Sequence, residues 1–195
     1  MRHLTRTTVA GVSLAAVLVG TDAVMPAVAS AAELGQTSVT LPMTVGGFDA
    51  RVAEANGYRI VTNGVGEKRS VPITAKAKMD AERPGVRNTV TGNCGSATLT
   101  ITRNNSRGGI NIQTGYTVKG TSVGHHWGVS GASNAGKAFT EGFSGVAGGS
   151  RWSATHFKAV YGYGQGGFGQ IDVGSFAQLA NGAMCFAGKA TSNWK

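Results

Sequence analysis

The sequence predicts an all-β protein whose main part is an antiparallel, β-sandwich-like domain with one disulfide. Two observations carry this expectation. Apolar and polar residues alternate over several short segments, and glycine-rich turns separate those segments, with 31 glycines in 195 residues. Short strands at close spacing are typical of sandwiches and barrels. We expect four parts: a signal peptide (1–31), a small N-terminal helix and hairpin segment (32–74), a linker (75–88) and the β-sandwich-like domain (89–195).

The first 31 residues have the three parts of a cleavable secretory signal. Arg2 and Arg6 precede an uncharged run over residues 9–20, and a stretch of small residues follows at 27–32. A run of about 12 residues is shorter than the ~20 needed to span a bilayer. We therefore expect a secreted, extracellular protein without a transmembrane segment in its mature form. Cleavage would follow one of three alanines, Ala29, Ala31 or Ala32.

The segment 32–74 carries signals of one helix and one hairpin. Phe48 and Val52 are spaced for one face of a short helix, and Asn56-Gly57 is a helix stop. Residues 58–62 and 70–73 alternate like strands on either side of an Asn-Gly turn. Residues 33–44 are interpreted as a polar, extended leader. The charged run that ends in Pro84-Gly85 is interpreted as a linker.

The domain 89–195 contains a series of alternating segments. One of them places His125, Trp127 and Val129 on the same face, and another does so for Trp152, Ala154 and His156. Residues 138–146 fit no single pattern. The predicted strands cover residues 97–102, 110–118, 123–130, 152–161, 171–176 and 183–187.

Cys94 and Cys185 are the two cysteines of the chain. An even pair in an exported protein is most simply a disulfide, which the chain-entropy model values at roughly 4–5 kcal/mol for a loop of this size. A metal pair or a redox pair is the alternative. The sequence offers no C-x-x-C spacing to support either one.

The positive charge is concentrated in the second part of the chain. The formal net charge is +9, and beyond Glu82 only Glu141 and Asp172 are acidic, against ten Lys and Arg. Such an excess favours an anionic partner, for example a cell-envelope polymer. The basic residues are scattered along the sequence, so solubility alone is the simpler explanation. The export signal makes intracellular nucleic acid an unlikely partner.

Three histidines, His125, His126 and His156, are candidate metal ligands or catalytic bases. His125 and His126 are neighbours on a predicted strand and point to opposite faces, so both cannot bind one metal without a bulge. His156 would have to lie across the sheet from one of them, and a zinc site needs further ligands. We predict no metal site and no cofactor.

Catalytic patterns are equally incomplete. Ser130 and Ser144 each lie in a glycine-flanked string that misses the G-x-S-x-G elbow by one position. Glu141 and Asp172 are the only candidates for a paired-carboxylate site in the domain. We assign no catalytic residue.

The loop after residue 160 interleaves glycines with aromatic residues. It lacks the lysine and the following helix of a phosphate-binding loop. It is either a flexible hairpin connection or a contact surface for a sugar or a protein. Its candidate contact residues are Tyr161, Tyr163 and Phe168.

Several short strings resemble small exported proteins of unknown function from high-GC Gram-positive bacteria. The resemblance rests on residues 48–60, 70–72, 93–96, 115–118 and 181–185. It implies a secreted β domain with a disulfide and transfers no catalytic residue.

The leading functional hypothesis is a non-enzymatic binding protein at or near the cell envelope, with an anionic polymer or a protein as partner. One alternative is a secreted hydrolase that pairs His125 or His156 with Glu141 or Asp172. Another is an inhibitor or toxin-like protein that presents the glycine-aromatic loop.

Overall fold

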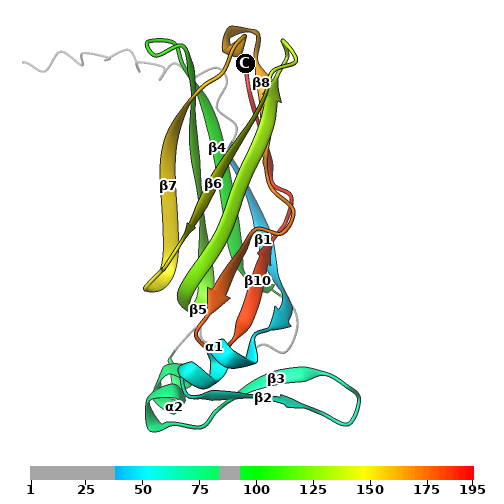
Figure 1. Cartoon of the computed structure of the whole chain (residues 1–195), viewed down its shortest axis with the longest axis vertical. Helices are drawn as coiled ribbons and strands as arrows, with labels where there is room; N and C mark the ends of the chain where they lie inside the picture. The colour runs from blue at the N-terminus through cyan, green and yellow to red at the C-terminus, as the bar shows by residue number, and fades with distance from the viewer. Residues whose placement is uncertain (1–37, 84–92) are drawn as a thin grey trace, which may run out of the picture. The chain divides into compact units, whose positions relative to one another are not determined.

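The computed structural model describes residues 38–83 and 93–195 (Figure 1). The predicted signal peptide lies outside these residues. The elements in chain order are β1 (Ser38–Phe48), α1 (Ala50–Ala55), β2 (Tyr58–Thr62), β3 (Lys68–Pro72), α2 (Ala75–Glu82), β4 (Asn93–Asn104), β5 (Gly109–Ser133), β6 (Ala138–Gly145), β7 (Gly149–Ala159), the 3₁₀ turn η1 (Tyr163–Gln165), β8 (Gly167–Ile171), β9 (Phe176–Leu179), β10 (Ala183–Ala187) and β11 (Thr191–Trp194).

One antiparallel sheet contains most of the strands and closes on itself. Its order is β11-β8-β5-β4-β1-β10-β9, and β9 also pairs with β5, so the two sides of the sheet join. The prediction of a mainly β protein is confirmed. The arrangement is barrel-like, whereas the sequence predicted two packed sheets. The difference arises because two predicted strands are one continuous strand, β5, which belongs to both sides.

Strand β5 changes partners near its middle. Its first half pairs with β4 and β7, and its second half pairs with β6, β8 and β9. The register with β7 shifts between Thr117 and Ser122, and Gly120 between them has a φ of 145°. A bulge with a glycine lets a strand bend sharply without a side-chain clash. The bend at Gly120 therefore closes the barrel.

The core fills the space between the two halves of β5. Trp127 is fully buried and donates a hydrogen bond from Nε1 to Thr114 Oγ1 at 2.9 Å, which satisfies its one polar group. Trp152 is only partly buried and packs against the edge of the core. The other buried residues include Leu99, Ile101, Ile110, Ile112, Tyr116, Val129, Ile171 and Trp194.

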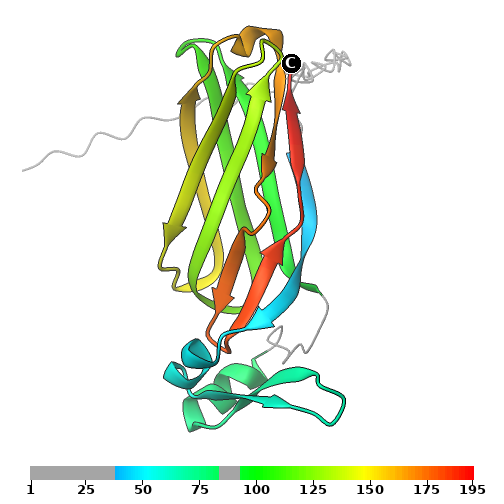
Figure 2. The same ribbon diagram turned by 45° about the vertical axis from the view of Figure 1, so that its right-hand side comes forward.

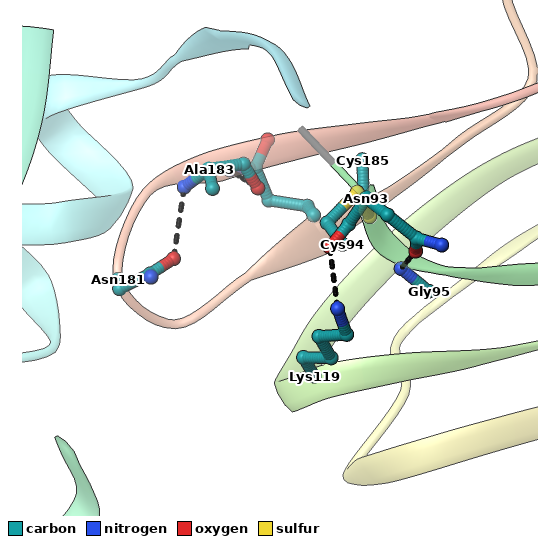
Figure 3. Close-up of a disulfide and its surroundings, with 8 residues drawn as sticks. Asn93, Cys94, Gly95, Lys119, Asn181, Ala183 and Cys185 are labelled. Carbon is teal, nitrogen blue, oxygen red and sulfur yellow. Dashed lines mark hydrogen bonds between the residues drawn. A yellow bond between two sulfur atoms is a disulfide. The ribbon is translucent and has the colours of Figure 1, made fainter. Parts of the chain in front are cut away.

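The predicted disulfide is present and joins β4 to β10 (Figure 3). The Cα atoms of Cys94 and Cys185 are 6.0 Å apart, and their sequence separation is 91. Strand β1 pairs with both of these strands, and Figure 2 shows β1 in blue beside the red β10. The disulfide therefore links the two neighbours of β1 in the sheet, one from the middle of the chain and one from near its C-terminus.

Of residues 33–44, interpreted as a leader, the described residues 38–44 form most of β1 instead. Val39, Leu41, Met43 and Val45 are turned inward and alternate with exposed residues. The Thr and Val alternation in this stretch was therefore a strand signal. After β1, the predicted helix is α1, and the predicted hairpin is β2 paired with β3.

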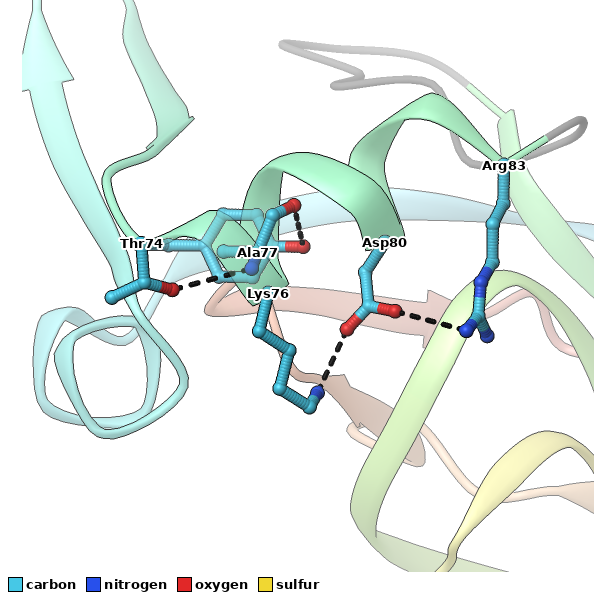
Figure 4. A network of polar contacts seen from close by, with 6 residues as sticks. Thr74, Lys76, Ala77, Asp80 and Arg83 are labelled. Atoms are coloured by element: carbon cyan, nitrogen blue, oxygen red, sulfur yellow. Dashed lines mark hydrogen bonds and ion pairs between the residues drawn. The ribbon is translucent and has the colours of Figure 1, made fainter.

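The segment interpreted as a linker contains helix α2. Thr74 caps its N-terminus, because Oγ1 accepts a hydrogen bond from the backbone N–H of Ala77 at 3.2 Å (Figure 4). Lys76 and Asp80 form an ion pair at 2.8 Å one turn apart. Residues 84–88 of the predicted linker lie outside the described part of the chain.

Strands β6 and β7 face each other without pairing. In the described chain, each pairs only with β5. Side chains close the gap: Glu141 of β6 contacts His156, at 2.8 Å, and Lys158 of β7. Phe143 packs against Trp152 with 5.8 Å between the ring centroids. We call these five residues the seam. Charged side chains beside unpaired strand edges hinder pairing with a further strand.

Candidate functional site: a cationic cleft

A cleft of about 640 Å³ lies where β5 bends. Its walls come from three parts of the chain: the bend itself, the connection from β6 into β7, and the residue that follows α2. The lining residues are Arg83, Thr117, Val118, Lys119, Gly120, Thr121, Gly148, Gly149, Ser150 and Arg151. We call this hollow the cationic cleft.

The charges that line the cleft are all positive. They belong to Arg83, Lys119 and Arg151, and the lining contains no carboxylate. Lys119 donates from Nζ to the carbonyl of Asn93 at 2.8 Å, next to the disulfide (Figure 3). Arg83 lies 3.3 Å from a carboxylate oxygen of Asp80 (Figure 4). A neutral carbonyl fixes the position of the Lys119 ammonium without cancelling its charge.

Hydroxyl groups and bare backbone complete the lining. Thr117, Thr121 and Ser150 are exposed and can both donate and accept hydrogen bonds. No atom outside its own chain neighbours lies within 4 Å of where a Cβ of Gly148 would be. The backbone on this side of the cleft is therefore open to a ligand, as in other sites where backbone approaches an anion.

Two smaller hollows adjoin the cleft. One, of about 250 Å³, shares Thr117 and Arg151 with it and extends over the outer face of β4, β5 and β7. The other, of about 30 Å³, shares Arg83 and reaches Tyr58. Burial, followed by the charge of the nearby Asp80, raises the pKa of Tyr58, so this phenol stays neutral at physiological pH.

The arrangement is suited to binding an anion. Cations that converge on one hollow raise the local positive potential, and an anionic group placed there relieves their mutual repulsion. Arginine adds a planar pair of donors that matches phosphate or carboxylate oxygens. Glu141 and Asp172, the late carboxylates of the sequence, do not line the cleft.

The sequence interpretation missed this site because its residues are far apart in the chain. Thr117 and Arg151 are paired across β5 and β7, and this register brings the two basic strings together. A local signal was present in each string: Lys119 precedes Gly120, and Arg151 follows Gly148-Gly149-Ser150. Basic residues that are scattered in sequence are thus clustered in the fold.

The candidate catalytic groups meet in three separate pairs. His156 Nδ1 lies 2.8 Å from Glu141, His126 Nδ1 lies 3.2 Å from Ser144 Oγ, and Ser130 donates to Asp172. Among the described residues, no hydrogen bond joins one pair to another. A nucleophilic triad needs serine, histidine and carboxylate in one chain of contacts. Each of the three pairs therefore lacks the third member of such a triad.

His125 and His126 point to opposite faces, as predicted. The ring of His125 packs against Trp152, with centroids 4.2 Å apart, and approaches the hydroxyl of Tyr116. Burial lowers the pKa of His125, so its neutral form is favoured in the folded protein. His126 lies against Phe176 on the other side of β5. In the described ranges no three His, Cys, Asp or Glu side chains form a group that would hold a metal ion.

The glycine-aromatic loop closes one end of the barrel. Tyr163 packs against the core, and its carbonyl accepts a hydrogen bond from Trp194 Nε1 at 3.0 Å. Tyr161 is 76% exposed, while its carbonyl accepts from Ser133 Oγ at 2.9 Å. Phe168 is 42% exposed on β8. Of the three candidate contact residues, Tyr161 is the most exposed, and Tyr163 packs against the core.

Comparisons with family models, with curated proteins and with solved structures give no match to this chain. The resemblance to small exported proteins therefore stays a prediction. None of the helices in the described ranges is long and apolar enough to cross a membrane.

Proposed function

We propose that the protein is a secreted, non-enzymatic binding protein that holds an anionic polymer at or near the cell envelope. The cationic cleft carries this proposal, because Arg83, Lys119 and Arg151 line one hollow that has no acidic lining residue. The disulfide supports the part of the proposal that concerns location, since such bonds persist in oxidising, extracellular compartments.

The test is a titration of the oxidised protein with fluorescently labelled inorganic polyphosphate. The expected result is binding at about 50 mM salt that weakens steeply towards about 200 mM salt, because cations on the polymer are released on binding. The double substitution Lys119→Ser and Arg151→Ser should lower the slope of log K against log salt by about two, roughly one for each lost contact.

A matched variant separates the cleft from net charge. Lys137→Ser with Lys189→Ser removes the same charge from exposed positions outside the cleft. Its affinity should stay close to that of the wild type. Equal losses in the two variants, or salt-insensitive binding by the wild type, would show that the cleft is not the site. A pull-down with purified cell-wall polymer repeats the comparison on a natural partner.

A second candidate function is the inhibitor or toxin-like contact with a protein through the glycine-aromatic loop. The large exposure of Tyr161 on a hydrogen-bonded backbone favours it, because a fixed, exposed tyrosine is a common anchor at protein interfaces. In a pull-down of protein partners, Tyr161→Ser should then lose the partner and keep polyphosphate binding. Retention of the partner would exclude this function.

A further inference from the structure

The outer face of β1, β4, β5 and β7 is a regular array of uncharged polar side chains. The pairing registers of these strands place residues in rows across the sheet. Residues directly opposite each other in a row share one face. The three rows are Ser38-Thr100-Gln113-Thr155, Thr40-Thr98-Gly115-Ser153 and Pro42-Ser96-Thr117-Arg151. We call this array the hydroxyl face.

Serine and threonine dominate the hydroxyl face, and Arg151 is its one charged residue in these rows. The spacing is set by the sheet: about 4.8 Å between strands, and about 7 Å between alternate residues along a strand. Threonine suits a strand in any case, which accounts for part of the pattern. Strand preference alone does not account for the lack of Lys and Glu on a solvent-facing surface.

Several hydroxyls of the face are open to a ligand, whereas Thr100 is buried and donates a hydrogen bond to Ser38 Oγ at 3.0 Å. Thr98, Thr117, Ser153 and Thr155 are exposed. Thr98 donates weakly to the carbonyl of Gly115 at 3.4 Å, so its oxygen can still accept hydrogen bonds. The face therefore presents hydrogen-bond donors and acceptors both along each strand and across the strands.

A hollow in the middle of the face leads to the cationic cleft. Gly115 stands between Thr98 and Ser153 in the middle row, and a Cβ there would collide with the carbonyl of Trp152 and lie 3.0 Å from the Cα of Ser153. The hollow is lined by Thr98 and Ser153, and it shares Thr117 and Arg151 with the cleft. A chain-like ligand bound in the cleft would thus continue directly onto the hydroxyl face.

We infer that the ligand is an anionic polysaccharide, whose charged groups occupy the cationic cleft while its sugar units lie on the hydroxyl face. The inference rests on the proposed function and specifies the class of polymer. Sugar hydroxyls donate and accept hydrogen bonds, as Ser and Thr do, so an uncharged hydroxyl array matches them and offers little to a chain of bare phosphates. Many weak contacts on one continuous chain add up through their high effective concentration.

The test compares two probes on the oxidised protein: an oligo-uronate, which is an anionic glycan, and inorganic polyphosphate of similar net charge. The face variant is Thr98→Val, Ser153→Ala and Thr155→Val, which removes hydroxyls and leaves every cleft residue in place. Valine keeps the shape and strand preference of threonine, so the fold should be retained. Circular dichroism and the unfolding midpoint check this.

The expected result is a loss of at least about tenfold in oligo-uronate affinity with less than about twofold change for polyphosphate. The matched control is Thr140→Val, Ser144→Ala and Thr191→Val, all exposed and outside the face. It should leave both affinities unchanged. An unaltered oligo-uronate affinity in the face variant, or equal losses for both probes, overturns the inference while the proposed function stands. Failure of the wild type to bind either probe overturns the proposed function itself.

Discussion

The two ends of the barrel use positive charge in different ways. At the end closed by the glycine-aromatic loop, the guanidinium of Arg107 lies 3.8 Å from the ring centroid of Phe157, and that of Arg103 lies 5.9 Å from the centroid of Tyr163. At the other end, Lys119 and Arg151 line an open hollow. The same residue types thus stabilise the fold at one end and remain available to a ligand at the other.

The cleft end is also the end that carries the covalent link. Asn93, whose carbonyl holds Lys119, immediately precedes Cys94 of the disulfide (Figure 3). The loop end depends instead on hydrogen bonds, such as that from Asn134 Nδ2 to the carbonyl of Gln165 at 2.8 Å. A binding site on a fixed backbone needs less ordering when the ligand arrives.

The largest expected effect is the loss of the disulfide. Cys94→Ala with Cys185→Ala should lower the free energy of unfolding by up to about 4–5 kcal/mol, since the unfolded chain regains the entropy of a long loop. Urea unfolding followed by tryptophan fluorescence measures this. Hydrogen exchange should accelerate around residues 93–95 more than around η1. Uniform acceleration at both ends would contradict the view that the disulfide mainly fixes the cleft end.

The second prediction is that two arginines have different roles, one in stability and one in binding. Arg107→Ser should cost about 0.5–1 kcal/mol of stability through the lost contact with Phe157 and leave polyphosphate affinity unchanged. Arg151→Ser should change stability by less than about 0.5 kcal/mol and weaken polyphosphate binding. Urea midpoints and binding titrations of both variants check this. If both substitutions lower stability alike, or both weaken polyphosphate binding alike, the distinction between the two ends of the barrel fails.

The smallest predicted effect is a change of fold stability with pH that arises at the seam. Burial alone would raise the pKa of Glu141, but the hydrogen bonds and charges of Lys158 and His156 lower it below its ordinary value. A carboxyl group with a lowered folded-state pKa stabilises the fold above its unfolded pKa of about 4.3, and this contribution is lost as the pH falls through the folded value.

His125 adds a second loss of fold stability, which begins at a higher pH than the loss due to Glu141. Its pKa is lowered by burial, so its contribution is complete above the unfolded value of about 6.5 and is lost as the pH falls below it. Urea midpoints from pH 8 to pH 3 should therefore fall in two stages. Glu141→Gln should reduce the lower stage and leave the upper one, and the remainder of the lower stage comes from Asp80, whose pKa Lys76 and Arg83 lower. A lower stage of unchanged size in Glu141→Gln would contradict the assignment.

The parts of the fold that could be predicted from the sequence are those with local signals. Alternation at residues 97–102 and 110–118 identified strands, and the even cysteine count identified the disulfide. Alternation does not reveal which strands are continuous, so the single strand β5 and the closure of the sheet were missed. The cationic cleft was missed for a related reason, because it depends on the pairing of Thr117 with Arg151.

We propose that an anionic polymer binds in the cationic cleft. The most direct measurement is an NMR titration of the isotopically labelled, oxidised protein with inorganic polyphosphate. We predict that the largest amide shifts fall at residues 117–121 and 148–151, which line the cleft. Largest shifts at the loop end, around residues 104–109 or 161–165, would contradict the claim.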